Sequence, residues 1–278
     1  ISRMLIQSNT LPWLCLTALI WVVGCTPSTK QQLDNRTLEL VWSDEFDGAE
    51  GSQPSSQYWT FEIGTGTDGW GNQELQYYTD RPENVSLDGE GHLVIQANQE
   101  SFGGMPFTSA RLKTQGKITK KYGRFEARIQ NPYGPGLWPA FWMLGENIDE
   151  VSWPQSGEID IMEMRGQLPQ VIHGSLHGPG YSGSNPVTQS YSLTNARFDA
   201  DFFVYAVEWS PDRIDFFVND YLYQRVTPDD VSGEWVFDQP FFLLLNVAVG
   251  GNYVGFPTQE TRFPQQMRVD YVRIYNLN

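Results

Sequence analysis

The chain has 278 residues, a length that fits one large domain, and it combines 14% aromatic residues with only 18% charged residues. Gly and Pro are frequent, and this mixture is typical of a β-sandwich with many turns. The formal net charge of −15 argues against a nucleic-acid partner and against electrostatic adhesion to an anionic lipid surface.

The beginning of the chain indicates export. Leu11–Gly24 is apolar, too short for a comfortable transmembrane helix, and placed where a secretion signal lies. It ends in Val22-Val23-Gly24-Cys25, which resembles a bacterial lipobox with Cys25 as the acylated first residue of the mature protein. An ordinary signal peptide with an incidental cysteine is the alternative. Because Thr26 is not Asp, we expect an outer-membrane lipoprotein of the cell envelope, or else a secreted protein.

The chain is expected to have three parts. Residues 1–24 form a signal peptide, residues 25–37 a lipidated cysteine with a flexible tether rich in Thr, Ser, Gln and Pro, and residues 38–278 one globular domain. The globular part contains no cysteine, so no disulfide holds its fold.

Strand patterns recur through the globular part. Segments rich in β-branched and aromatic residues, separated by turn residues, predict strands at Leu38–Trp42, His92–Ala97, Gly123–Ile129, Ala140–Leu144, Val171–Leu176, Phe203–Trp209, Arg213–Val218, Phe241–Val249 and Met267–Tyr275. Trp209–Ile214 predicts a hairpin through a Pro-Asp turn. Helical periodicity is confined to a turn or two, so the expected fold is all-β, a two-sheet antiparallel sandwich.

The segment Glu158-Ile159-Asp160-Ile161-Met162-Glu163 predicts a strand that carries three carboxylates. Because a strand alternates its faces, Glu158 and Asp160 point one way and the isoleucines point into a core. On a regular strand Glu163 would face the side opposite to Glu158 and Asp160. One extra residue, a β-bulge near Met162, would bring it back to their face. Clustered acids are costly in a strand, and a pair of carboxyl groups across one bond is what glycoside hydrolysis needs. A solvated acidic strand edge is the alternative.

Aromatic residues accompany the acidic strand. Trp138 and Trp142 lie just upstream, and Trp153-Pro154 leads into it. Flat aromatic faces suit the apolar side of a pyranose, while polar groups take its hydroxyls. Core packing is the alternative for each tryptophan. A neutral polysaccharide also suits the acidic surface, since it offers no charge to repel.

The acidic strand, in the form Gly157–Glu163, resembles the signature of glycoside hydrolase family 16, and its inserted Met resembles the laminarinase-like branch. The resemblance covers roughly Leu38 to Tyr275. It extends to six further motifs in order, at Val41–Phe46, Gly69–Tyr78, Ser109–Leu112, Tyr122–Glu126, Leu176–Gly183 and Asp270–Tyr275. The resemblance implies a concanavalin A-like jelly roll with a concave sheet that binds sugar.

The resemblance also implies a retaining mechanism that needs no cofactor. Glu158 matches the nucleophile and Glu163 the acid/base, and Asp160 lies between them on the same face. Since both are glutamates on one strand, their spacing does not say which has which role. His177 matches a histidine beside the acid/base, with a hydrogen-bonded structural residue as the alternative.

Binding residues are implied by family position and by the loops. By position the candidates are Asn72, Arg111, Trp138, Trp142 and Asn246, whose polar groups and rings suit sugar hydroxyls and faces. For Arg111 an ion pair within the fold is the alternative. Trp70 and Tyr181 lie in Gly-rich loops, where a large exposed aromatic residue needs a reason.

The family resemblance implies one metal. Members often hold a structural calcium far from the catalytic cleft, and the matching positions are Glu45, Gly91 and Asp270. A carboxylate with backbone carbonyls is a sensible donor set for this hard cation. Ordinary surface hydrogen bonding is the alternative.

The expected function is endo-acting, retaining hydrolysis of β-1,3-glucosidic bonds in laminarin-type glucans. We expect a monomer that meets a membrane only through a lipid anchor. A mixed-linkage β-glucan or a galactan as substrate is an alternative that Gly69–Tyr78 and His177–Gly183 make less favourable. A glucan-binding protein that has lost catalysis is the third reading, but such relatives typically lack a catalytic glutamate, and both are present here.

Overall fold

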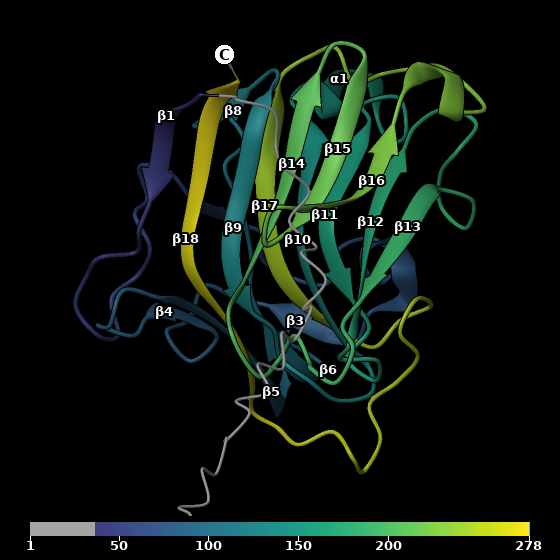
Figure 1. The fold of residues 1–278 in the computed structure, drawn as a ribbon. Helices are drawn as coiled ribbons and strands as arrows, with labels where there is room; N and C mark the ends of the chain where they lie inside the picture. Colours follow the sequence, from purple (N-terminus) through teal and green to yellow (C-terminus); the bar gives the residue numbers. More distant parts are fainter. Residues whose placement is uncertain (1–36, 278) are drawn as a thin grey trace, which may run out of the picture.

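Two β-sheets form the layers of a sandwich in the computed structural model, which describes residues 37–277 (Figure 1). The predicted signal peptide, Cys25 and the tether up to Arg36 lie outside the described residues. Within the described range, no helix is long and apolar enough to span a membrane.

One layer is a ten-stranded sheet. Its main order is β16-β15-β14-β9-β18-β5-β6-β3, with β1 beside β18 and β4 beside β5. The pair β3 and β6 is parallel, and the other pairs of this sheet are antiparallel. Its strands are β1 (Leu38–Asp44), β3 (Gln76–Tyr78), β4 (Val85–Leu87), β5 (Leu93–Phe102), β6 (Met105–Ser109), β9 (Gly123–Gln130), β14 (Phe203–Ser210), β15 (Arg213–Val218), β16 (Tyr221–Val226) and β18 (Gln265–Leu277).

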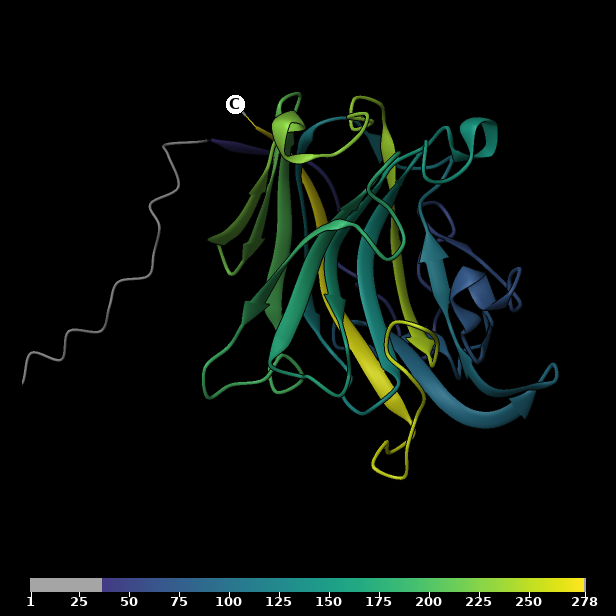
Figure 2. The same ribbon diagram turned by 90° about the vertical axis from the view of Figure 1, so that its right-hand side faces the viewer.

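The other layer is an eight-stranded sheet with the order β13-β12-β11-β10-β17-β7-β2 and with β8 beside β17. Its strands are β2 (Thr60–Phe61), β7 (Arg111–Lys113), β8 (Thr119–Lys120), β10 (Leu137–Gly145), β11 (Glu158–Met164), β12 (Val171–His177), β13 (Val187–Ser192) and β17 (Phe241–Val249). Short helical turns occupy loops at η1 (Gly69–Gln73), α1 (Ile148–Val151) and η2 (Pro228–Asp230). The connection from β17 to β18 extends beyond the strand ends in both views (Figures 1 and 2).

The predicted all-β sandwich is confirmed. Each predicted strand is present, and the predicted hairpin joins β14 to β15 with Ser210 opposite Arg213. β10 begins at Leu137 rather than Ala140, and β5 runs on to Phe102. Short strands such as β2, β3 and β7 escape the sequence pattern, because two or three residues carry no periodicity and pairing with a neighbour decides their conformation.

The core lies between the sheets and follows from alternation along the strands. In β9, Phe125, Ala127 and Ile129 point inward and are fully buried. β17 is buried over its whole length, since a second, smaller apolar cluster covers its other face. Burying a side chain such as Leu or Phe contributes about 1.5–3 kcal/mol. β17 therefore anchors its neighbour β10, which carries tryptophans on the outer face of the eight-stranded sheet. We call this outer face the active face.

Candidate active site

A β-bulge in β11 places three carboxylates on the active face. Asp160 and Glu163 are separated by two residues, Ile161 and Met162, whereas the residues opposite them on β10 and on β12 are separated by one. Ile161 and Met162 are both buried in the core. Glu163 therefore returns to the face of Glu158 and Asp160, and the bulge predicted near Met162 is confirmed.

Glu158 and Asp160 share a histidine neighbour. His177 Nε2, on β12, lies 3.1 Å from Asp160 Oδ2 and 3.7 Å from Glu158 Oε1. The other oxygen of Glu158, Oε2, accepts a hydrogen bond from Trp153 Nε1 at 2.9 Å. Trp153 lies in the loop between α1 and β11, so this loop holds one oxygen of Glu158 in place. Sequence analysis found Trp153 only as a flanking aromatic residue.

Glu163 is held by neutral donors. Trp138 Nε1 donates to Glu163 Oε1 at 3.0 Å, and Ser175 Oγ lies 3.5 Å from Glu163 Oε2. Indole and hydroxyl groups orient a carboxyl group without neutralising its charge. Among residues 37–277, no lysine or arginine forms an ion pair with any of the three carboxylates of β11.

Burial dominates the protonation of these three groups. It raises the pKa of Glu158 to about 8, together with the charge of Asp160. It raises the pKa of Glu163 to about 7, together with the charge of Glu158, and it also raises the pKa of Asp160. The cluster therefore shares protons near neutral pH. Because the groups are coupled, one carboxylate can be ionised for attack while another keeps its proton for donation; the higher pKa of Glu158 opposes its ionisation and does not identify the nucleophile.

A stacked arginine lies on one side of the carboxylates. The Arg111 guanidinium carbon is 4.6 Å from the ring centroid of Trp70 and 4.7 Å from that of Trp142. Arg111 Nε is also 2.5 Å from Glu62 Oε2. Arg111 therefore forms the ion pair that was the alternative expectation, and its position between two indoles fixes Trp70 and Trp142 relative to each other.

A hydrogen-bond chain supports Trp142. Its Nε1 donates to Asn246 Oδ1 at 2.8 Å, and Asn246 Nδ2 donates to the Tyr78 hydroxyl at 3.1 Å. Glu74 accepts from that hydroxyl at 3.3 Å and from Asn72 Nδ2 at 3.2 Å. Burial raises the pKa of Glu74. Both candidate asparagines thus bond within the protein, and sequence analysis missed Glu74 and Tyr78, although their even spacing along one segment was an available signal.

A second aromatic group lies at the Glu163 end of the acidic strand. The ring centroid of Tyr253, in the connection after β17, is 4.8 Å from that of Trp138. The Arg165 guanidinium carbon lies 4.2 Å from the Tyr253 ring, and the His173 ring meets it edge-on at 6.2 Å. Sequence analysis missed Tyr253 and Arg165. The pair Gly250-Gly251 directly after a buried strand was the signal for a loop that reaches the site.

Tyr181 is buried, so the expectation that it is exposed to bind sugar is wrong. Its residue surface is 1% exposed, and its hydroxyl donates to the Glu234 carbonyl oxygen at 2.8 Å. The ring lies against Gly178, where a Cβ atom would collide with the hydroxyl. Gly178 therefore leaves room for the buried ring of Tyr181, and this Gly-rich loop does not expose that ring on the surface.

The carboxylates expected to bind calcium are paired with arginines. Both oxygens of Glu45 accept hydrogen bonds from Arg273, at 2.9 and 2.7 Å, and Asp270 accepts one from Arg128 at 2.5 Å. The guanidinium groups neutralise these acids and place positive charge where a cation would sit. Glu45 and Asp270 as placed therefore do not fit calcium, and ordinary surface pairing describes these two carboxylates better; the backbone of Gly91, the third expected position, is not engaged by these pairs, and its part in a calcium site stays a prediction.

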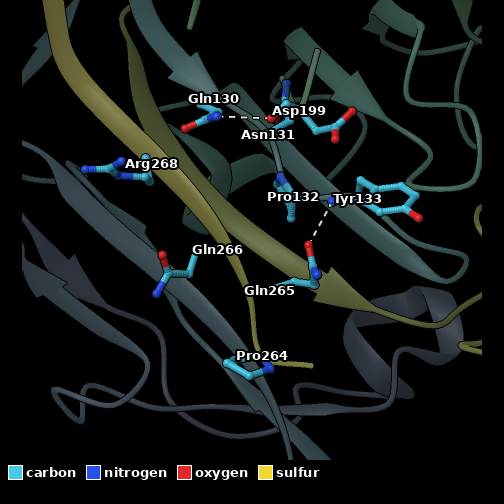
Figure 3. A pocket seen from close by; sticks show the side chains of 9 residues that line it. All are labelled: Gln130, Asn131, Pro132, Tyr133, Asp199, Pro264, Gln265, Gln266 and Arg268. Carbon is cyan, nitrogen blue, oxygen red and sulfur yellow. Dashed lines mark hydrogen bonds between the residues drawn. The ribbon is translucent and has the colours of Figure 1, made fainter. Parts of the chain in front are cut away.

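A separate polar hollow lies between the end of β9 and the beginning of β18 (Figure 3). Its amides bond within the protein, since Gln130 Nε2 donates to the Asp199 carbonyl oxygen and Gln265 Oε1 accepts from the Tyr133 backbone N–H. Asp199 is the only acid in its lining, and its carboxylate is held by Arg197. Without a second carboxyl group, this hollow does not compete with β11 as a site of glycoside chemistry.

Comparison with known proteins found a family match, a similar curated protein and similar solved structures. Residues 69–273 match the glycosyl hydrolases family 16. A beta-glucanase of Rhodothermus marinus is 43% identical over 265 residues, which cover 91% of each chain. The endo-beta-1,3-glucanase structure from Pyrococcus furiosus has a TM-score of 0.84 at 47% identity, covering 88% of this chain and 97% of that chain. The laminarinase catalytic domain from Thermotoga maritima MSB8 has a TM-score of 0.81 at 46% identity, covering 86% and 98%.

Proposed function

The chain belongs to glycosyl hydrolases family 16, and on that premise we propose that it is an endo-acting β-1,3-glucanase that cleaves laminarin-type glucans with retention of configuration. The observation that carries the proposal is the bulge of β11, which brings Glu158, Asp160 and Glu163 to one face, where indole N–H groups hold both glutamates. A retaining glycosidase needs such a pair of carboxyl groups on either side of one bond.

The reaction divides between the two glutamates. Glu158 attacks the anomeric carbon while Glu163 gives its proton to the departing glycosidic oxygen, so the C–O bond breaks and a glycosyl–enzyme ester forms. Glu163, now ionised, takes a proton from water, and this water attacks the ester and releases Glu158. Trp153 and Trp138 orient the two groups through their N–H donors. Asp160 and His177 lie beside Glu158 and influence how readily it loses its proton.

The alternatives differ in substrate or in chemistry. A mixed-linkage β-glucan or a galactan would use the same carboxylates with different binding residues. A glucan-binding protein without catalysis is disfavoured, because a buried acid cluster with no lysine or arginine partner costs stability and is the kind of group that proton transfer needs.

The test is release of reducing ends from laminarin, lichenan and agarose side by side. We expect fastest release from laminarin, with a ladder of oligosaccharides early in the reaction, as endo-cleavage requires. Faster hydrolysis of lichenan or agarose would replace the proposed substrate, and no release from any of the three would contradict the enzymatic function.

We also propose that the catalytic domain is a monomer exported to the cell envelope and anchored through an acylated Cys25. This proposal rests on the apolar stretch and the lipobox-like Val22–Cys25 of the sequence. Cys25→Ser should move the protein from the membrane fraction to the soluble fraction. Wild-type protein that is already soluble after export would contradict the anchor, and gel filtration would test the monomer.

A further inference from the structure

Three side chains of the active face direct ligand atoms toward one point. These atoms of Glu158, Asp160 and His177 lie within 4.8 Å of one another. His177 Nε2 is 3.1 Å from Asp160 Oδ2 and 3.7 Å from Glu158 Oε1. In a tetrahedral zinc site with bonds of about 2.0–2.1 Å, neighbouring ligand atoms stand about 3.3–3.4 Å apart. The two separations bracket that value, and we propose that this cluster is a Zn²⁺ site at which the ion reversibly inhibits the hydrolase.

The oxygen atoms of the cluster are available to a cation. Asp160 is 3% exposed, and outside the cluster its Oδ2 has no hydrogen-bond partner among residues 37–277, since its near neighbour His177 Nε2 is itself a proposed ligand. A buried carboxylate oxygen with no donor beyond the cluster is costly, and a bound cation satisfies it. Trp153 engages Oε2 of Glu158 and leaves Oε1 for the metal. A ligating carboxylate held by an outer donor is the usual arrangement in metal sites.

The cluster is open on one side. The side chains of Glu158 and His177 are 17% and 12% exposed, so an ion can reach them from the active face. The fourth position of a tetrahedral ion then keeps a water molecule. One imidazole nitrogen and two carboxylate oxygens suit Zn²⁺, whereas Ca²⁺ takes about six to eight oxygen ligands and Mg²⁺ requires an octahedron.

A second cluster provides an internal control. Asp88, Glu90 and His92 also bring ligand atoms within 4.8 Å of one another. There Arg268 Nη2 lies 2.6 Å from Asp88 Oδ2 and 3.7 Å from Glu90 Oε2, so a guanidinium already takes the place of a cation. We expect no zinc at this cluster.

Inhibition follows from the ligand set. A zinc bond to Oε1 of Glu158 occupies a lone pair that attack on the sugar requires, so zinc and substrate exclude each other. This consequence rests on the proposed function, whereas the binding of zinc rests on the geometry alone.

The experiment titrates ZnCl₂ into the full-length protein by calorimetry, and into the variants Asp160→Asn and His92→Asn after circular dichroism has verified their fold. One ion per chain is expected in the wild type and in His92→Asn, with a Kd at least about tenfold higher in Asp160→Asn. Zinc should inhibit laminarin hydrolysis with an inhibition constant equal to that Kd. His92→Asn should keep wild-type activity and inhibition.

Three outcomes would overturn the zinc site: equal affinity in the wild type and Asp160→Asn, loss of binding in His92→Asn alone, or a visible spectrum of added Co²⁺ that stays that of the six-coordinate ion. The last measurement uses wild-type protein and therefore does not depend on the folding of a variant. Zinc binding as expected, in a protein that hydrolyses none of the glucans, would support the site and contradict the proposed function.

Discussion

Acidic side chains on the two sheets have opposite surroundings. On the outer face of the ten-stranded sheet, Arg124 contacts Glu126, Glu208 and Asp220. The acid next to β1 is paired in the same way, since the Arg273 guanidinium lowers the pKa of Glu45. The carboxylates of β11 are about as buried as Glu126 and Glu208 but have indole, hydroxyl and imidazole neighbours, and their pKa values are raised.

A buried carboxylate can therefore serve either the stability of the fold or proton transfer, depending on its neighbours. A carboxylate beside a guanidinium stays ionised over the physiological range and has no proton to exchange. A buried carboxylate without a cation holds its proton near neutral pH and can transfer it. The second arrangement costs stability, and substitutions in the two groups of acids should separate the two roles.

Removing the nucleophile should have the largest effect. Glu158→Ala should lower laminarin hydrolysis by about 10⁴-fold or more, because the covalent step is lost, while glucan binding changes little. With an activated glycosyl donor and azide, this variant should form an α-glycosyl azide, since azide enters from the vacated side. Full activity in Glu158→Ala would end the retaining mechanism.

Removing the acid/base should be severe but dependent on the leaving group. Glu163→Ala should lower laminarin hydrolysis by about 10²–10⁴-fold, and aryl glucosides with good leaving groups should be partly spared because they need little protonation. Azide should give the β-glycosyl azide through the intact covalent intermediate. If the two variants give the opposite stereochemistry, the roles of Glu158 and Glu163 must be exchanged.

Breaking an arginine pair should affect stability and leave the chemistry intact. Arg124 is 2% exposed, so Arg124→Met removes the guanidinium beside the buried acids Glu126 and Glu208 and should lower the free energy of unfolding by about 3–5 kcal/mol. The matched control is Arg197→Met, because the Arg197 side chain is 45% exposed in its pair with Asp199 and should matter by less than about 1 kcal/mol. Denaturant unfolding measures both. Equal effects would mean that burial does not decide the strength of these pairs.

The smallest effect concerns stability against pH. The folded state raises the pKa of Glu158 to about 8 from its ordinary value of 4.5, so the stability contributed by its proton is complete below about pH 4.5 and is lost as the pH rises through 8. Glu158→Gln should therefore raise the Tm at pH 8, by about 2–4 °C for each 1 kcal/mol of the ionisation cost that the neutral amide removes. Glu45→Gln should lower the Tm at pH 8, because it removes a carboxylate that is stabilised by Arg273. A lower Tm in Glu158→Gln at pH 8 would contradict the cost assigned to the acid cluster.

Local patterns were enough to predict the strands and the bulge. Segments rich in β-branched and aromatic residues, bounded by turn residues, predicted β9, β14, β15 and β17, because such side chains suit a buried pleated surface. The odd spacing of Glu158 and Glu163 predicted the bulge, because only an extra residue reconciles three acids on one face with two isoleucines in the core. Family resemblance supplied the roles of the glutamates, which no spacing could distinguish.

The sequence by itself determined the sandwich, the acidic strand and its bulge, because each depends on side-chain periodicity within one segment. Tertiary structure alone decided the partners: Tyr181 turned inward, Arg111 between Trp70 and Trp142, and Tyr253 against Trp138. Each of these contacts joins residues far apart in the chain. Whether a loop residue is exposed, or an arginine binds an acid or a ring, depends on what the rest of the fold brings to it, and no local pattern records that.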